Sequence, residues 1–262
     1  MITVLKILIP VGIVVAAGIL LGVALVLVSK FMAVKVDEKQ EKIRACLPGA
    51  NCGSCGYSGC DGYAAAIANG EASPDKCSPG GKATAKALSE ILGVSVESVP
   101  KVAFAGCGRT CDTTKKAFDY SGLLSCQAAS LVNKGEYACE FACVGFGDCV
   151  KACTFSAIEL INGKPVICED LCIGCGNCAA ACPKGIIKVL PKSATVKVGC
   201  SNKLKGPKVV KDCTVSCIAC GMCTRACESG AISIVDNLAV IDYDKCIGCG
   251  KCKEACKRNV IV

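Results

Sequence analysis

The sequence predicts an α+β protein with an apolar N-terminal helix, a small cysteine-rich domain and two tandem cysteine-rich modules. The first observation behind this prediction is a stretch without charged residues, 7–28. The second is a run of cysteines that is repeated 74 residues further along the chain. The third is the composition, because 27 of the 262 residues are Cys, none is His or Trp, and only 4% are aromatic. Small domains with so few aromatic side chains bury little surface, so we expect something other than an apolar core to hold them together.

The uncharged segment predicts a transmembrane anchor over residues 1–29. At about 1.5 Å per residue, a helix over residues 7–28 can cross a hydrocarbon core of about 30 Å. A cleaved secretory signal has a shorter apolar region and a small-x-small cleavage site, which residues 26–30 do not offer. We therefore expect the anchor to be retained, followed by a charged juxtamembrane helix over residues 30–45.

The charges that flank this segment predict its orientation. One lysine, Lys6, precedes it, whereas five basic residues follow it closely: Lys30, Lys35, Lys39, Lys42 and Arg44. By the positive-inside rule, we expect a single-pass protein of the cell (inner) membrane with its cysteine-rich domains in the cytoplasm. Because thiols stay reduced there, the cysteine count indicates metal ligation rather than disulfides.

Three cysteine runs have the spacing C-x2-C-x2-C-x3-C of bacterial ferredoxins with two [4Fe-4S] clusters. In those proteins three cysteines of each run bind one cluster and the fourth binds the other. An altered fourth run ends at Cys149 and Cys153. The runs predict two ferredoxin-like modules, residues 139–212 with an extension and residues 213–262. Isoleucines that fall five residues after each final cysteine predict short strands at Ile158, Ile187, Ile232 and Ile261.

The 74-residue offset also aligns the cysteines of the first module that depart from the regular spacing with positions in the second module. Cys139 aligns with Cys213, and Phe146 stands where the repeat has Cys220. We therefore expect Cys139 to replace the missing ligand of the first module. Cys168 aligns with Asp242, and we expect it to be a buried small apolar residue rather than a ligand.

Four predicted cluster sites follow from the crossover rule. The first module is expected to use Cys139, Cys143, Cys149 with Cys182, and Cys172, Cys175, Cys178 with Cys153. The second module is expected to use Cys217, Cys220, Cys223 with Cys256, and Cys246, Cys249, Cys252 with Cys227.

A fifth four-cysteine site is predicted within a membrane-proximal domain of residues 46–82. Its ligands would be Cys52, Cys55, Cys60 and Cys77, with interleaved glycines that let backbone amides turn toward the sulfur atoms. Structural zinc also prefers four thiolates, so a zinc site is the alternative. Between this domain and the modules, residues 83–138 are expected to be a linker that contains a short helix over 84–92.

The order of these parts resembles the B subunit of the Rnf complex, the ion-translocating ferredoxin:NAD⁺ oxidoreductase. The resemblance covers nearly the whole chain and rests on residues 51–56, 145–150, 182–184, 198–200 and 238–242. It implies a sixth [4Fe-4S] cluster, bound by Cys107, Cys126, Cys200 and Cys213, with Cys111 as a rival for one corner. Cys46, Cys111 and Cys168 would then remain outside the clusters.

The resemblance implies a membrane-anchored electron-relay subunit. Reduced ferredoxin would supply electrons, and other Rnf membrane and flavin or NAD subunits would receive them, with NAD reduction coupled to Na⁺ or H⁺ translocation. The sequence has no catalytic acid or base and no glycine-rich phosphate motif for NAD, flavin or ATP, so we assign hydride chemistry to partners. An iron–sulfur subunit of a hydrogenase or formate dehydrogenase complex is one alternative. A zinc-binding scaffold is another, whereas nucleic acid is not expected as a partner.

Eight lysines and no acidic residue lie between Lys184 and Lys211. They could steer an acidic ferredoxin toward the protein. They could equally compensate the negative charge of the clusters, and the sequence does not decide between these roles.

Overall fold

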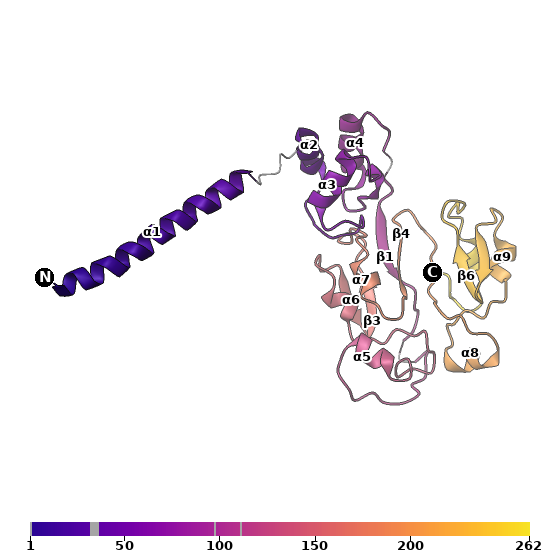
Figure 1. Ribbon diagram of the computed structural model, residues 1–262. Helices are drawn as coiled ribbons and strands as arrows, with labels where there is room; N and C mark the ends of the chain where they lie inside the picture. The colour runs from indigo at the N-terminus through magenta and orange to yellow at the C-terminus, as the bar shows by residue number, and fades with distance from the viewer. Residues whose placement is uncertain (1, 32–36, 97, 111) are drawn as a thin grey trace. The chain divides into compact units, whose positions relative to one another are not determined.

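A computed structural model describes residues 2–31, 37–96, 98–110 and 112–262. The chain forms two compact units, Met1–Glu41 and Lys42–Val262 (Figure 1). Each is described by itself below.

Helix α1 (Ile2–Phe31) makes up most of the first unit. Within the described residues, the structure contains no helix with the length and apolarity that a membrane crossing requires. The next helix, α2 (Glu38–Cys46), begins after Asp37, whose Oδ1 accepts the Lys39 N–H at 3.1 Å. Asp37 is thus the N-cap of α2 and is not itself helical. The prediction of one continuous helix over residues 30–45 is therefore wrong at Asp37. Residues 32–36 of that prediction lie outside the described residues.

The second unit begins with a small helical domain. It consists of α3 (Cys60–Ala68), the 3₁₀ turn η1 (Pro74–Lys76) and α4 (Gly81–Leu92), which pack with Ile43 of α2. Tyr63 and Leu88 are fully buried in its core. The helix expected over residues 84–92 is confirmed as α4, which begins three residues earlier.

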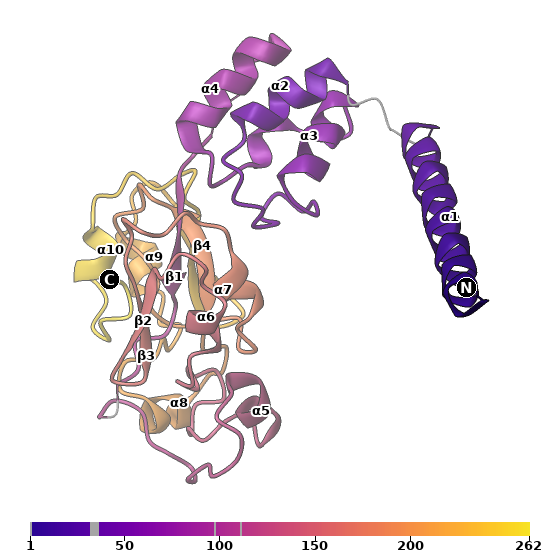
Figure 2. The same ribbon diagram turned by 90° about the vertical axis from the view of Figure 1, so that its left-hand side faces the viewer.

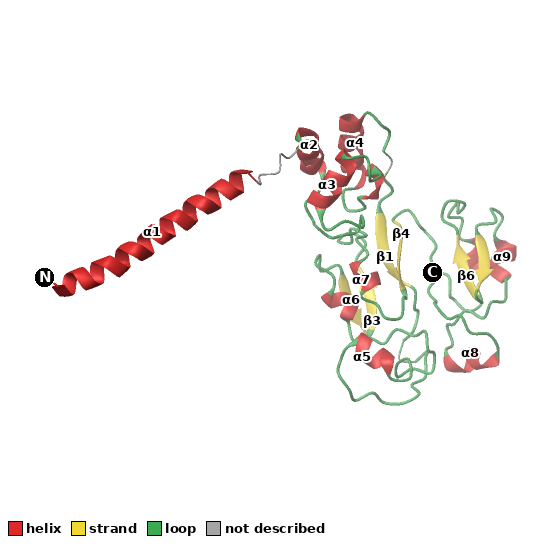
Figure 3. Ribbon diagram, in the orientation of Figure 1, coloured by secondary structure: helices red, strands yellow, loops and turns green. Residues whose placement is uncertain are grey.

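The two ferredoxin-like modules each contain one antiparallel hairpin. In the first module β2 (Ile158–Ile161) pairs with β3 (Lys164–Ile167), and in the second β5 (Ile232–Val235) pairs with β6 (Leu238–Ile241). Short helices carry the cysteine runs: α6 (Asp148–Lys151), α7 (Asn177–Ala180), α9 (Met222–Ala226) and α10 (Lys251–Glu254). Loops make up much of the rest (Figure 3).

The isoleucines predicted to start strands do so in three of the four places. Ile158, Ile187 and Ile232 are the first residues of β2, β4 and β5. Ile261 forms an isolated bridge with Val198 instead of a longer strand.

The segment expected to be a linker adds a strand to the first module. Strand β1 (Lys101–Ala105) pairs antiparallel with β4 (Ile187–Pro191), and the two lie side by side in Figures 1 and 2. The segment also contains α5 (Cys126–Leu131). Residues 83–138 are therefore only partly a connection. The remaining helix, α8 (Pro207–Asp212), precedes the second module.

Gly174 and Gly248 occupy equivalent loops of the two modules, which gives a matched test of the contact with β1. Both have positive φ, 66° and 71°. A Cβ on Gly174 would lie 2.4 Å from the backbone oxygen of Lys101, whereas on Gly248 it would meet only the side chain of Thr195.

We expect Gly174→Ala to lower the free energy of unfolding by about 1–3 kcal/mol more than Gly248→Ala does. Both variants strain φ, but only the first forces backbone against backbone. Thermal unfolding followed by circular dichroism measures the difference. Equal midpoints would show that β1 does not constrain this loop.

Candidate iron–sulfur cluster sites

Three hollows in the second unit are each lined by four cysteines. They have similar empty volumes of about 360, 300 and 310 Å³. Their cysteines are Cys126, Cys143, Cys149 and Cys182 in the first; Cys107, Cys139, Cys200 and Cys213 in the second; and Cys153, Cys172, Cys175 and Cys178 in the third.

The first hollow corrects the sequence-based partition, because Cys126 and not Cys139 completes it. Asp148, at the start of α6, positions Cys126 beside Cys149. Its Oδ2 accepts the Ser125 hydroxyl at 2.9 Å and the Gln127 N–H at 3.1 Å. Burial alone would raise the pKa of Asp148, but these hydrogen bonds outweigh it and lower that pKa, so the residue is a stable anion.

Cys139 lies in the second hollow because a short ladder holds it there. Thr114 bridges to Cys213 on one side, and Lys116 bridges to Tyr137 on the other. The Ala138 N–H donates to the Lys115 carbonyl at 2.9 Å. Between Cys107 and Cys143 the chain has 19 residues more than between Cys200 and Cys217, and this inserted segment brings Cys139 and Cys213 to one hollow. We call it the shared site, since its cysteines come from both modules.

The shared site has an internal repeat that the sequence analysis missed. Gly106 and Gly199 each donate an N–H at 2.7 Å, to Ile186 and Val260, which are 74 residues apart. The next residues, Cys107 and Cys200, each accept a backbone N–H at 3.4 Å, from Cys143 and Cys217. The signal was the Gly-Cys pair after each strand-like segment, which is displaced by 93 residues rather than 74.

The second module follows the crossover rule in its packing. Its core contains Cys217, Cys223 and Cys252, with Cys227, Cys246 and Cys256 against it. Electrostatic neighbours of Cys223 are Cys217 and Cys256, and those of Cys252 are Cys227 and Cys246. Cys220 and Cys249, the middle cysteines of the two runs, are exposed.

The cysteines of the domain over residues 46–82 also lie together. Burial raises the pKa of the Cys77 thiol, and Cys60, Cys52 and Cys55 raise it further. Asn51 shapes this loop, with φ 45° and its Oδ1 accepting the Cys60 N–H at 2.9 Å.

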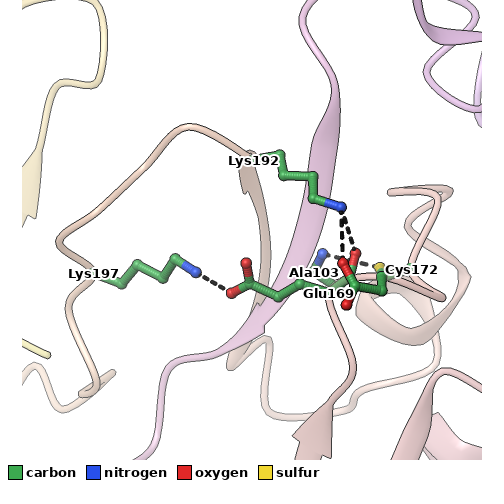
Figure 4. Close-up of polar contacts among 6 residues, drawn as sticks. Ala103, Glu169, Cys172, Lys192 and Lys197 are labelled. Atoms are coloured by element: carbon green, nitrogen blue, oxygen red, sulfur yellow. Dashed lines mark hydrogen bonds and ion pairs between the residues drawn. The ribbon is translucent and has the colours of Figure 1, made fainter.

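Backbone amides and hydroxyl groups form hydrogen bonds with the cysteine sulfur atoms. The Ala103 N–H of β1 donates to Cys172 Sγ at 3.3 Å (Figure 4), and Thr114 Oγ1 donates to Cys213 Sγ at 3.2 Å. Cys200 Sγ accepts two N–H groups, from Asn202 and Cys217, both at 3.4 Å. Such donors stabilise thiolates and tune the potential of a bound cluster.

Burial raises the pKa of the Cys139 and Cys143 thiols to about 12. Both are therefore protonated near neutral pH when no cluster is bound. Because the thiolate is the ligand, cluster insertion has to release these protons. The tetrads, their sulfur-directed donors and their hollows fit [4Fe-4S] clusters.

The three cysteines outside the predicted sites have different surroundings. Cys168 is exposed, so the prediction that it is buried is wrong; it lies at the edge of the hairpin, where its N–H pairs with Ala157. Cys46 packs against the core of the small helical domain that contains Tyr63 and Leu88. Cys111 lies outside the described residues. Among the residues that are described, no three or more Cys, Asp or Glu side chains are grouped so as to hold a single metal ion.

Most of the eight lysines between Lys184 and Lys211 have contacts. Lys184 and Lys188 are half-buried, and burial lowers the pKa of both side chains. The nearby Cys139 opposes this decrease at Lys184, and the nearby Cys200 opposes it at Lys188. Lys192 and Lys197 contact the loop at Glu169 (Figure 4), and Lys203 pairs with Asp236. Exposed lysines without an ion pair to a described residue are Lys205, Lys208 and Lys211.

The fold and the cysteine tetrads define a multi-cluster iron–sulfur protein. Three family models agree: an Fe-S cluster model over residues 47–79, a 4Fe-4S binding domain over 165–188 and a 4Fe-4S dicluster domain over 216–260. The chain binds several [4Fe-4S] clusters.

Curated relatives cover most of the chain. It is 41% identical, over 91% of its length and 72% of the relative's, to the B subunit of the Na⁺-translocating ferredoxin:NAD⁺ oxidoreductase complex of Acetobacterium woodii. It is 40% identical, over 86% of its length and 80% of the relative's, to the B subunit of the proton-translocating complex of Clostridium ljungdahlii. The chain belongs to this family, the B subunits of the Rnf complexes, in which it is an iron–sulfur electron-relay subunit.

Double substitutions distinguish the two partitions of the first module. If Cys126 and Cys143 serve one cluster, as the structure indicates, Cys126→Ala with Cys143→Ala should lose about four irons per chain. Cys139→Ala with Cys143→Ala should lose about eight, because it damages two sites. Iron analysis of anaerobically purified protein measures both. The reverse pattern would restore the partition expected from the sequence, and Cys168→Ala serves as the control with unchanged iron.

Proposed function

We propose that this chain relays electrons from reduced ferredoxin, through six [4Fe-4S] clusters, to other Rnf subunits that reduce NAD⁺. The observation that carries the proposal is the continuity of the cysteine sites. Each of the six sites has a cysteine in contact with, or electrostatically next to, a cysteine of another site. Iron–sulfur clusters exchange single electrons, at potentials set by charge, hydrogen bonds and exposure.

The six cysteine sites form a continuous row, and its first part joins the membrane-proximal site to the first module. Cys52 is an electrostatic neighbour of Cys175 and adds to the burial that raises the pKa of that thiol. Within the module, Cys149 and Cys178 share one apolar core, with Cys153 and Cys182 packed against it. Three sites therefore follow one another.

The shared site connects the two modules. The Cys143 N–H donates to Cys107 Sγ, and the Cys217 N–H donates to Cys200 Sγ. A ligand of each module thus contacts a sulfur atom of the shared site. The row continues to Cys227 and Cys252 of the second module. Cys249 of the second module is exposed. We therefore propose that ferredoxin delivers its electron to the cluster at this end of the row.

The membrane part of the proposal is supported by the sequence and by family membership. Residues 7–28 carry no charge, and basic residues concentrate after them. We propose a single-pass anchor in the cell (inner) membrane, with the cysteine-rich domains in the cytoplasm. The relatives are named for Na⁺ or for proton translocation, and we assign the coupling to partner subunits.

Reduced ferredoxin should bleach the visible absorbance of the purified chain without any other subunit. The same mixture should not reduce NAD⁺, because hydride chemistry is assigned to partners. Anaerobic stopped-flow spectroscopy measures the first, and absorbance at the NADH band the second. Failure of ferredoxin to reduce a chain that dithionite does reduce would contradict the proposed donor.

The exposed lysines near α8 offer a test of docking. Charge reversal of Lys205, Lys208 and Lys211 should slow reduction by ferredoxin about tenfold at low salt, and the effect should shrink as salt rises. Lys82→Glu with Lys86→Glu, which reverses two exposed lysines of α4, is the control for a change of charge elsewhere on the surface. An unchanged rate at low salt would assign the lysines to compensation of cluster charge instead.

A further inference from the structure

Arg109 is the largest fully buried side chain among the described residues, with 2% of its surface exposed. Its Nε donates to the Cys143 carbonyl at 2.8 Å, and its Nη2 donates to the Gly163 carbonyl at 2.7 Å. The ring of Tyr137 covers the guanidinium, with Cζ 4.0 Å from the ring centroid. Nη1 is buried and has no hydrogen-bond partner among the described residues.

This side chain lies between two candidate cluster sites. It lines the shared site together with Cys107, Cys139, Cys200 and Cys213. Through its hydrogen bond to Cys143 it also contacts a ligand of the adjacent site in the first module. No carboxylate among the described residues forms an ion pair with it. A buried guanidinium is always charged, and leaving it without an anion is costly.

We propose that Arg109 is a tuning residue whose buried positive charge is shared by the two sites and raises the reduction potential of both. The thiolates of the two tetrads, with their clusters, are the anions that this charge faces. Reduction adds negative charge to a cluster, so a nearby cation favours the reduced state.

The internal repeat does not supply a second fully buried arginine. Arg109 follows Cys107 by two residues, and the residue in the same place after Cys200 is Asn202. Asn202 is 3% exposed and neutral, and its side-chain oxygen accepts the Leu204 N–H. Arg109 is therefore the fully buried cation of the shared site, whereas Lys188, beside Cys200, and Arg258, which donates to the Cys213 carbonyl at 2.8 Å, are only half-buried.

The inference deepens the proposed function and rests on it, because both sites have to hold clusters. The test is a redox titration of the isolated full-length protein, followed by electron paramagnetic resonance with chemical mediators and without ferredoxin. A failure of Arg109 to tune the clusters is then distinguishable from a failure of the relay.

Arg109→Gln should lower the ratio of reduced to oxidised cluster at least tenfold in two of the clusters at a fixed solution potential. For a one-electron couple this is a shift of about 59 mV toward more negative potential. Arg109→Lys keeps the charge and should stay within about threefold of the wild type. Arg225→Gln removes an exposed arginine from between Cys223 and Cys227, and should leave all potentials unchanged because water screens that charge.

Unchanged potentials in Arg109→Gln, or equal shifts in the Gln and Lys variants, would overturn the proposal. If Arg109→Gln assembles with less iron, Tyr137→Leu decides, because it keeps both hydrogen bonds and only uncovers the guanidinium to water. Its two affected clusters should shift about threefold in the same direction, with Phe118→Leu, a half-buried aromatic residue that lines none of the three hollows, as the aromatic control. No shift in a fully loaded Tyr137→Leu protein would then contradict the role of the buried charge.

Discussion

Thiolate convergence is the constraint on which the second unit depends. Each site needs four cysteine side chains around one hollow, and the chain between them has to turn within two or three residues. This explains the left-handed glycines, such as Gly174, and the four- or five-residue helices that carry the ligands. Apolar packing alone buries little surface, because the sheets are two-stranded and the aromatic residues are few. Folding and cluster insertion are therefore coupled.

Duplication provides the sites, and an insertion completes them. The second module keeps its own run, whereas the first has Phe146 where a cysteine would stand. Phe146 instead packs with Tyr120, Ala129 and Val144 around Cys126. The inserted segment thus replaces the lost ligand and frees Cys139 for the shared site. One segment both repairs the first module and links it to the second.

Much of this organisation could be predicted from the sequence, because cysteine spacing within a run is local. The strands that begin at Ile158 and Ile232, and the proximity of Cys223 to Cys256 and of Cys252 to Cys227, are of this kind. The partner of Cys143 could not be predicted, since Cys126 is brought to it by Asp148, a residue 22 positions further on that the pattern does not mark. Family resemblance alone implied Cys107, Cys200 and Cys213 of the shared site, but it assigned Cys126 to the position where the structure has Cys139. Arg109 was not predicted, because nothing in a sequence shows that a guanidinium is buried without an anion.

The lysines between Lys184 and Lys211 differ in their contacts. Lysines that contact loops or cysteines, such as Lys184 and Lys197, stabilise the modules locally. Lys205, Lys208 and Lys211, around α8, are exposed and form no ion pair with a described residue.

The most direct test of the account is the iron and acid-labile sulfide content of anaerobically purified full-length protein, with spectra before and after dithionite. Six sites of four cysteines predict about 24 irons and as many sulfides per chain, and a brown colour that reduction bleaches. A content of about 20 irons would show that only five clusters are bound and would contradict a cluster in the shared site. A colourless protein that contains zinc and no sulfide would contradict the electron relay as a whole.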